Sequence, residues 1–385
     1  MDLWDMNLRH LAAVAKIAEL GTMNAAASAV NLTQPALTQA LARIEAALGL
    51  PLFERRHDGM VPTDAADLLV PRLRAASDHI ASSQVTMSRM RALLALADSG
   101  SYKGAAIATG LSLPSLHRAV ADLSLSLRRR LVDRRGKAVV LTEAGTALVR
   151  AFRLARLELQ AGFAEVEALK GHETRRIVIG AMPLSRAKVL PAAVAQFLKR
   201  HTQVRISIVE GSRAELAEPL RNGMIDMMVG ALRVPLMEPD LAQEELFRDQ
   251  PVVVARKGHP LDGGPGKGPL SELAVLAAYP WVVAGPGAPL RLAWEHMFTS
   301  AGLEPPDVPI ESGSVMIIRQ LLINSDLLTL LSPDQVAVEL EAGWLVSLGS
   351  APAGQERTIG VTTRATWRPT VVQEEFLQEL RRAAG

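Results

Sequence analysis

The side chains best suited to intermolecular chemistry lie in the N-terminal part of the sequence. Gln34, Thr38 and Gln39 carry amide and hydroxyl groups on the face opposite an apolar stripe of helical spacing. Groups of this reach can hydrogen-bond base edges and phosphates in a major groove. Nearby arginines add positive charge that can grip phosphates: Arg43, Arg55 and Arg56. Isolated polar residues more often form a solvent-exposed helix face without a binding role. Whether these side chains bind DNA therefore depends on the helices and strands that position them.

Those elements are predicted to be three short helices and a hairpin. Apolar residues recur at helical spacing in three stretches: Leu11–Ala18, Ala25–Ala29 and Leu37–Leu48. Thr33 is a credible N-cap for the third helix, and Pro35 lies in its first turn, where a missing N–H costs nothing. The segment PLFERRHDGMVPT alternates apolar residues around a His-Asp-Gly turn, which predicts a β-hairpin wing. A helix followed by a tight helix-turn-helix and a wing is typical of DNA-binding domains. Within such a domain, the polar residues are more readily interpreted as DNA contacts.

The same layout recurs 79 residues further on. Without a gap from residue 11 to 70, Ala18, Gly21, Ala26, Leu32, Pro35, Leu37, Leu48, Leu52, Arg55, Arg56 and Thr63 match Ala97, Gly100, Ala105, Leu111, Pro114, Leu116, Leu127, Leu131, Arg134, Arg135 and Thr142. The sequence therefore predicts a duplicated module. We name residues 7–70 the first module and residues 86–146 the second module.

Composition restricts the compartment and the chemistry. The chain has no cysteine, which excludes disulfides and thiolate metal sites and is consistent with a reducing cytosol. We find no export signal and no apolar run of the roughly 18 residues that a membrane helix needs, so we expect a soluble cytoplasmic protein without a membrane partner. Residues 1–150 carry 18 Lys/Arg and 13 Asp/Glu, net +5, and the remainder is net −3. This asymmetry favours a polyanion-binding end on a neutral or acidic body.

Beyond the second module the pattern changes. A long amphipathic helix is predicted from Glu143 to about Lys170, and we assign residues 147–172 to a linker and dimerisation helix rather than a packed domain helix. Residues 71–92 are predicted to be a shorter helical link between the modules. From about Arg175, helical stretches separate short β-branched runs: RRIVIGAM, RISIVEG, IDMMVGA, PVVVARKG, PWVVAGP and LLTLLS. The alternation predicts α/β structure with mainly parallel sheets over residues 173–385.

Residues 7–66 resemble the winged helix-turn-helix of LysR-type transcriptional regulators, most clearly in AAASAVNLTQPALTQALARIEAALGLPLFERR. The long helix and the α/β remainder are similar to that family's effector-binding region. The stretches IGAMPLSRAKVLPAAV, GMIDMMVGALR and LTLLSPDQV resemble the subgroup that includes the galactose-binding-protein regulator. The resemblance implies a multidomain fold: two copies of an all-α winged helix-turn-helix, followed by a two-lobed α/β effector domain like periplasmic binding proteins. The family normally has one DNA-binding module, and this chain departs from it by having two.

The resemblance implies a sequence-specific regulator that binds double-stranded DNA as a homo-oligomer, a dimer or a tetramer, under the control of a small-molecule effector. The family's recognition helix maps onto residues 34–47. The implied DNA contacts of the first module are Gln34, Pro35, Thr38, Gln39, Arg43, Arg55 and Arg56.

The second module keeps its core positions, but its surface differs. Leu113 stands where the first module has Gln34, His117 where it has Thr38, and Arg118 where it has Gln39. Its candidate DNA contacts are Ser115, Arg118, Arg128, Arg129, Arg130, Arg134 and Arg135. We hypothesise that this module adds phosphate affinity more than sequence choice. The alternative is a relic that serves as a spacer, with arginines that only keep it soluble.

Two-lobed binding folds hold ligands at the carboxyl ends of strands and at helix N-termini. The positions of this kind that we predict to bind the effector are Met182, Ser185, Gly230, Ala231, Pro286, Gly287, Arg291 and Ser332. A plain turn or helix cap is the alternative for each loop. Because few aromatic side chains are available, we expect recognition through hydrogen bonds and one arginine. The effector class stays open between a sugar, a sugar acid and an aromatic acid.

Other function classes have less support. The sequence has no P-loop, no G-x-S-x-G elbow and no H-E-x-x-H motif, and its eight histidines are scattered, so we expect no metal, no cofactor and no enzymatic activity. A solute-binding protein is one rival, but it needs an export signal and leaves the duplicated basic module unexplained. An enzyme that uses a cleft between the lobes is the other rival, and the sequence shows no paired acid and base for it.

Overall fold

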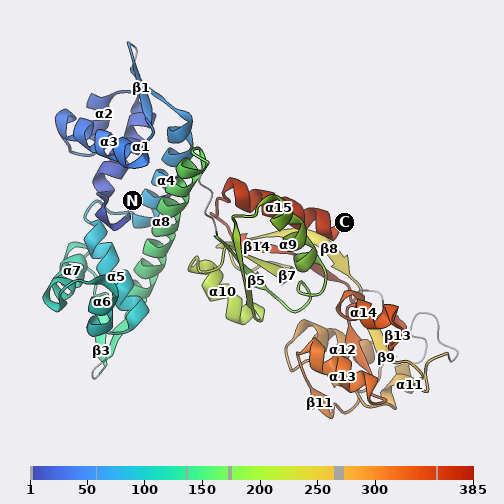
Figure 1. The fold of residues 1–385 in the computed structure, drawn as a ribbon. Helices are drawn as coiled ribbons and strands as arrows, with labels where there is room; N and C mark the ends of the chain where they lie inside the picture. Colours follow the sequence, from blue (N-terminus) through green and yellow to red (C-terminus); the bar gives the residue numbers. More distant parts are fainter. Residues whose placement is uncertain (1–2, 58, 136–137, 172–175, 264–272, 353) are drawn as a thin grey trace. The chain divides into compact units, whose positions relative to one another are not determined.

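The computed structural model describes residues 3–57, 59–135, 138–171, 176–263, 273–352 and 354–385. The chain forms two compact units, Met1–Arg175 and Arg176–Gly385. Figure 1 shows helices and paired hairpins in the first unit and sheets covered by helices in the second unit.

The first module has the predicted elements. A 3-10 turn η1 (Leu3–Asp5) precedes α1 (Leu8–Leu20), α2 (Met23–Ala29), α3 (Gln34–Leu48), β1 (Phe53–Arg56) and β2 (Gly59–Pro62). The predicted N-cap is confirmed, because the Thr33 side chain accepts a hydrogen bond from the backbone N–H of Ala36. The predicted wing is also confirmed: β1 and β2 pair antiparallel. Asp58 of the expected turn lies outside the described residues.

The second module repeats these elements in the same order. It contains α5 (Met87–Ser99), α6 (Tyr102–Thr109), α7 (Leu113–Ser126), β3 (Val132–Arg135) and β4 (Ala138–Leu141). Each begins 79 residues after its counterpart in the first module.

Backbone hydrogen bonds recur at the same offset. The N–H of Met60 donates to the carbonyl of Gly21 at 2.8 Å, and the N–H of Val139 donates to that of Gly100 at 3.4 Å. In both modules a threonine hydroxyl then closes the wing, with Thr63 donating to Pro51 and Thr142 donating to Arg130. The two modules therefore hold their wings against their first helices by the same contacts.

A long helix follows each wing. They are α4 (Asp64–Ile80) and α8 (Glu143–Ala168), and they pack against each other. The expectation that α8 is a connector rather than a packed domain helix is wrong in this respect, because Phe152, Leu159 and Val166 bury its apolar face within the first unit. The predicted helical link at 71–92 is interrupted, since α4 ends at Ile80 and α5 begins at Met87.

A buried ion-pair cluster lies between α4 and α8. Arg72 contacts Glu158 at 3.0 Å and Glu165 at 2.8 Å, and all three residues are less than a tenth exposed. Burial acts to lower the pKa of Arg72, but hydrogen bonds and charge from Glu165 and Glu158 outweigh it, so the pKa is raised. Arg72 therefore stays charged and neutralises carboxylates that would otherwise be buried without a cation.

Among its described residues, the second unit contains two larger sheets and one strand pair. The strands are β5 (Arg176–Ala181), β6 (Arg205–Glu210), β7 (Met227–Ala231), β8 (Leu241–Asp249), β9 (Val252–Arg256), β10 (Val282–Val283), β11 (Ile310–Glu311), β12 (Thr329–Leu331), β13 (Leu345–Ser350) and β14 (Arg357–Arg364). Their orders are β6-β5-β7-β14-β8, β12-β9-β13 and β10-β11. All six predicted runs form strands.

The expectation of mainly parallel sheets is wrong. Strand β5 pairs parallel with β6 and β7, and β10 pairs parallel with β11, but β14 runs antiparallel to β7 and β8. The three-stranded sheet is wholly antiparallel. The additional antiparallel strands β8, β13 and β14 are more polar, so a search for continuous apolar runs does not find them.

The described helices of this unit are α9 (Val189–Arg200), α10 (Arg213–Arg221), α11 (Leu273–Ala277), α12 (Pro289–Thr299), α13 (Val315–Ile323), 3-10 turn η2 (Pro333–Val336), α14 (Ala337–Glu341) and α15 (Val371–Ala384).

Each larger sheet has its own apolar core. Phe197 and Phe376 pack beside the five-stranded sheet. Trp281 and Trp294 pack beside the other sheet. No helix among the described residues is long and apolar enough to cross a membrane.

Candidate nucleic-acid interface and effector site

The face presented by α3 carries the predicted polar residues. Leu37, Leu41 and Ile44 are buried, whereas Gln34, Pro35, Gln39 and Arg43 are exposed on the other side. Thr38 is half-buried, and its hydroxyl donates to the carbonyl of Gln34 at 3.0 Å. The helix thus presents two amides and one guanidinium to solvent, a set able to read base edges and grip phosphate.

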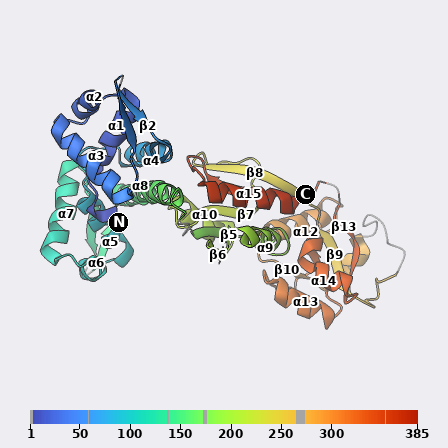
Figure 2. The same cartoon turned by 45° about the horizontal axis from the view of Figure 1, so that its top comes forward.

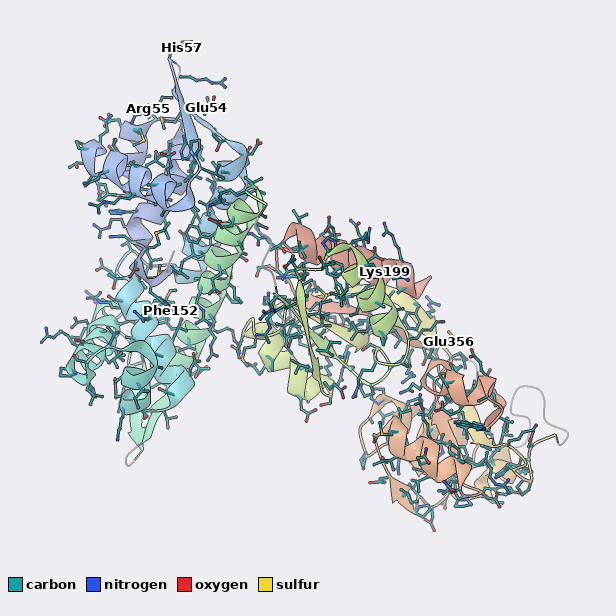
Figure 3. The ribbon with its side chains drawn as sticks, viewed as in Figure 1. Glu54, Arg55, His57, Phe152, Lys199 and Glu356 are labelled. Carbon is teal, nitrogen blue, oxygen red and sulfur yellow. The ribbon has the colours of Figure 1, made fainter. Side chains whose placement is uncertain are left out.

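The wing is tied to the end of α3. One carboxylate oxygen of Glu45 accepts the N–H of Leu52 at 2.7 Å and that of Phe53 at 3.3 Å. Figure 3 shows Arg55 and His57 on the hairpin that projects from the first module. This anchoring fixes the direction in which the wing leaves the helix.

The helix start and the wing meet at a shallow hollow. It has a volume of about 300 Å³ and is lined by Thr22, Met23, Gln34, Thr38, Arg55, Arg56, Gly59 and Met60. Arg55 and Arg56 are exposed, and Arg56 also pairs with Glu54 at 2.9 Å. The structure therefore brings the predicted helix and wing residues to one surface.

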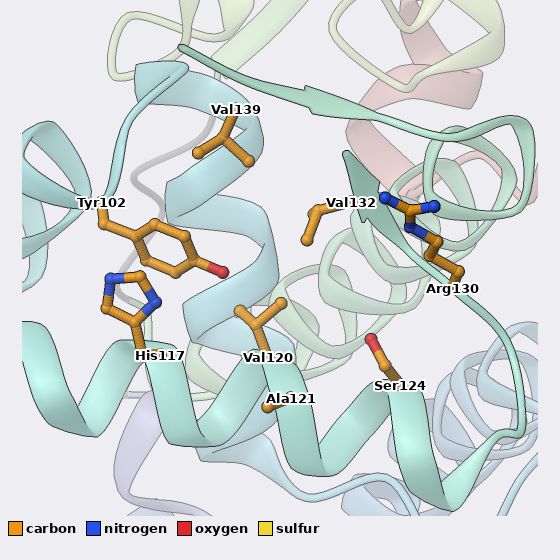
Figure 4. Close-up of a pocket in the computed structure, with 8 residues that line it drawn as sticks. All are labelled: Tyr102, His117, Val120, Ala121, Ser124, Arg130, Val132 and Val139. Carbon is orange, nitrogen blue, oxygen red and sulfur yellow. The ribbon is translucent and has the colours of Figure 1, made fainter. Parts of the chain in front are cut away.

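The corresponding surface of the second module is different. The ring of His117 stacks on Tyr102 with centroids 3.6 Å apart, and both line a hollow of about 370 Å³ (Figure 4). The remaining lining is mostly apolar, with Ser124 and Arg130 as its polar members. Leu113, at the start of α7, is 44% exposed. The polar hollow of the first module has thus become an aromatic and aliphatic one.

Tyr102 was not among the predicted site residues. It occupies the position of Met23 in the first module, and only two tyrosines occur in the whole sequence. A rare aromatic residue at the start of an alanine-rich helix is a signal that could have identified it.

Exposed arginines lie on α7 and directly after its end. Arg118, Arg128 and Arg129 are exposed, and Arg130 is exposed with an ion pair to Asp133 at 2.6 Å. The hydroxyl of Ser115, also exposed, bonds that of Ser112 at 2.8 Å. The backbone of Arg134 and Arg135 lies in β3, but their side chains are outside the described part of the structure.

Arg128 has an unusual backbone conformation. Its φ is 53°, in the left-handed region that favours glycine, and its counterpart is Gly49 with φ 68°. The second module therefore holds an arginine where the turn geometry favours glycine, next to two further arginines.

In the second unit, the first two predicted effector loops lie side by side. Met182 follows β5, and its N–H donates to Val229 of the neighbouring strand β7 at 3.0 Å. A Cβ at Gly230 would lie 2.5 Å from the Met182 side chain, so this close approach requires glycine. Ala231 ends β7 and is half-buried.

The Ser185 hydroxyl, which we predicted to bind the effector, forms a hydrogen bond within its own turn. Ser185 is fully buried, and its hydroxyl donates to the carbonyl of Met182 at 2.9 Å. The turn over residues 183–188 precedes α9, so this hydroxyl stabilises the turn.

The other predicted effector loops follow β10 and β12. These strands are neighbours, since the N–H of Val282 donates to Leu328 at 2.9 Å. Pro286 and Gly287 are exposed between β10 and α12. Ser332 is 1% exposed and forms a capping box with Gln335, but its hydroxyl makes no well-formed hydrogen bond within the described part of the chain.

The side chain of Arg291 is already paired. It contacts Glu295 at 2.7 Å and Glu311 at 3.2 Å, and it lies over the ring of Trp294. These carboxylates compete with any anionic ligand for its charge.

One ion pair joins the two groups of loops. Lys188, at the end of the turn after β5, lies 3.6 Å from Asp334 in the turn after β12. The structure thus brings the Met182 and Ser332 loops to the same region of the second unit. Among the described residues, no cluster of three or more His, Asp or Glu side chains could hold a metal ion.

Comparison with known families gives three matches along the chain. The LysR substrate binding domain matches residues 170–385. The bacterial regulatory helix-turn-helix protein, lysR family, matches residues 8–67 and again residues 87–146.

Among curated relatives, the HTH-type transcriptional regulator GalR of Pseudomonas putida is 32% identical over 374 residues, covering 93% of this chain and 92% of GalR. The uncovered 7% is shorter than either helix-turn-helix match, so the similarity includes parts of both. The SDS degradation transcriptional activation protein of a Pseudomonas strain is 31% identical over 284 residues, covering 72% of this chain and 90% of that protein.

A similar solved structure is that of full-length OxyR from Pseudomonas aeruginosa, in a variant with a cysteine changed to aspartate. It is 21% identical, with a TM-score of 0.56, and the match covers 77% of this chain and 97% of that chain. This likeness supports the arrangement of a helix-turn-helix domain followed by an α/β substrate-binding domain.

The matched families and the 93% coverage of this chain by the GalR match are decisive for the class of protein. This chain belongs to the LysR family of DNA-binding transcriptional regulators, which carry an effector-binding domain and are not enzymes.

Proposed function

We propose that this regulator carries two winged helix-turn-helix modules of one origin with different tasks. The first module reads sequence through Gln34, Thr38 and Gln39, and the second module adds affinity through Arg118 and the arginines at 128–130. The observation that supports this proposal is that α1 to α3 and both wing strands recur at an offset of 79 while the exposed side chains differ. Residues buried for folding are retained, and residues facing DNA are free to change the mode of contact.

The proposed domain division follows from these assignments. The modules span residues 7–70 and 86–146, a linker helix that packs on α4 of the same chain spans 147–172, and the effector domain spans 173–385. The protein acts as a homo-oligomer in the compartment of its target DNA, the cytoplasm. Likeness to the galactose-binding-protein regulator subgroup stays a prediction.

Selection of DNA from a random duplex pool tests the DNA-binding proposal. Full-length protein is expected to enrich one consensus. Gln34→Ala with Gln39→Ala should lower discrimination between that duplex and a scrambled duplex by about tenfold or more, because these substitutions remove the bidentate amide hydrogen bonds to adenine.

The matched control is Leu113→Ala with Arg118→Ala in the second module. It should keep discrimination and only weaken both affinities. Failure to enrich any consensus, or unchanged discrimination in the first-module variant, contradicts the proposed function.

For the effector domain, we propose a two-lobed fold of the periplasmic-binding-protein type with its ligand between the Met182–Gly230 loops and the Pro286–Ser332 loops. The support is the Lys188–Asp334 pair between these loops and the buried hydroxyl of Ser332, for which the described residues supply no well-formed hydrogen bond. An unpaired buried hydroxyl costs free energy, which a hydrogen-bonding ligand would recover.

Thermal unfolding with galactose, gluconate and benzoate tests this site by representing a sugar, a sugar acid and an aromatic acid. Binding of one class should raise the Tm and change DNA affinity. Ser332→Ala should weaken that shift. A Tm shift that Ser332→Ala leaves intact would place the effector elsewhere.

A further inference from the structure

The packing of α4 on α8 relates the two modules within one chain. Each helix starts directly after its wing, at Asp64 and at Glu143. The chain runs from the first module along α4 into the second module, and α8 then runs back. Its far end returns to the first module, where the Lys170 ammonium donates to the carbonyl of Leu48 at 2.8 Å. The two helices are therefore antiparallel.

Close contact fixes this arrangement. A Cβ at Gly162 of α8 would lie 2.9 Å from the side chains of Leu69 and Arg72 of α4. The missing side chain lets the helices approach, and the buried cluster of Arg72, Glu158 and Glu165 joins them. At the chain start, Arg91 of the second module lies over the ring of Trp4.

Antiparallel pairing of equivalent helices implies an approximate two-fold rotation. Because α4 and α8 are antiparallel, a rotation that superposes α4 on α8 has to turn the helix end over end. Each helix follows its own module in the same way, so the same rotation superposes the first module on the second. Consistently, α1 packs on α4 and α5 packs on α8. Figure 1 shows the wings β1 and β3 at opposite ends of this unit, and Figures 1 and 2 show α3 and α7 on the same side of the helix pair.

We infer that one chain reads an inverted pair of DNA half-sites, with α3 in one major groove and α7 in the next, about the axis through the α4–α8 pair. Duplex DNA has two-fold axes of its own, so two modules related in this way match an inverted repeat. The inference rests on the proposed function of both modules. It adds that the pair of half-sites is contacted by a single chain.

The surface chemistry makes the two half-sites unequal. The α3 site faces Gln34 and Gln39, whereas the α7 site faces Leu113 and Arg118. One half-site is therefore specified by base contacts, and the other by its distance from the first and by phosphate contacts.

The absence of cysteine from the sequence permits a direct test. Two single-cysteine variants of the full chain are labelled with a DNA-cleaving reagent: His57→Cys on the first wing, and Val140→Cys at an exposed position of β4 on the second wing. Each labelled protein is bound to the selected duplex and its cut sites are mapped. Wild type treated with the reagent is the control, because it has no thiol to label.

The expected cuts lie at the two outer edges of a pair of protected windows whose centres are about ten base pairs apart. The mass of the complex gives the number of chains, and hydroxyl-radical footprinting is expected to show two windows per chain. One window per chain, or cuts from His57→Cys without cuts from Val140→Cys, overturns the inference and leaves sequence reading by the first module intact. Failure to select any duplex would instead overturn the proposed function.

Discussion

In the first module, one glutamine, two threonines and two arginines line the hollow beside α3, whereas the second module has a Tyr102–His117 stack, three valines and a single arginine there. Yet the wing of each module is held by equivalent backbone hydrogen bonds. The comparison shows which features the fold requires and which the ligand requires. Caps, wing closure and core leucines recur because each module needs them to fold, while the exposed faces have diverged.

The largest expected effect is on the helix pair that joins the modules. Arg72→Met leaves Glu158 and Glu165 buried without a cation, so the free energy of unfolding of the first unit should fall by about 3–5 kcal/mol. Urea unfolding, followed by amide hydrogen exchange in α4 and α8, measures the change.

The control for Arg72→Met is Arg56→Met, which breaks an exposed ion pair on the wing. It should change the free energy of unfolding by less than about 1 kcal/mol. Equal effects of the two variants would show that the buried cluster does not stabilise the joined modules.

Introducing the polar residues of α3 into α7 should have an intermediate effect on the free energy of base discrimination. Leu113→Gln, His117→Thr and Arg118→Gln together give α7 the polar face of α3. The protein should then discriminate bases in the second window by about 1–3 kcal/mol. Selection from the random pool measures the gain. A second window that stays unspecified would mean that α7 does not enter a groove as α3 does.

The smallest expected effect concerns the backbone at Arg128. Arg128 has a φ of 53°, a left-handed conformation that strains a residue with a side chain. Arg128→Gly relieves this backbone strain, so the free energy of unfolding should rise by about 0.5–1 kcal/mol. Arg129→Gly removes the same charge from a residue that lacks this positive φ and should not stabilise. If both variants destabilise equally in urea, the φ at Arg128 imposes no strain.

Sequence periodicity predicted the first unit well because its signals are local. The stripe Leu37, Leu41 and Ile44, the cap at Thr33 and the 79-residue offset each depend on a few neighbouring residues. The packing of α8 on α4 was not predicted, because the pattern of an amphipathic helix shows which face is apolar but not which other helix packs against that face. Gly162 and Arg72 become informative only when the two helices are seen together.

The second unit was predicted less completely. Continuous apolar runs identified β5, β7 and β9, whereas the polar strands β8 and β14 have weak patterns and depend on non-local pairing. For the same reason, the pairing of Arg291 with two glutamates and the burial of Ser185 were not visible in the sequence. The residue type indicates which groups a side chain can bind. Its neighbours in the folded structure determine whether that side chain is exposed and unpaired enough to bind a ligand.

The central claim is that the first module recognises the DNA sequence and the second module adds phosphate affinity. Its most direct test is the salt dependence of DNA binding. Full-length wild type is compared with the variant in which Arg118, Arg128, Arg129 and Arg130 are changed to alanine, on the selected duplex and on a scrambled duplex. The slope of log affinity against log salt should flatten by about 0.9 for each phosphate that the variant no longer neutralises, while the ratio of the two affinities stays the same. An unchanged slope would make the second module a spacer, and a ratio that falls to one would make it a sequence reader.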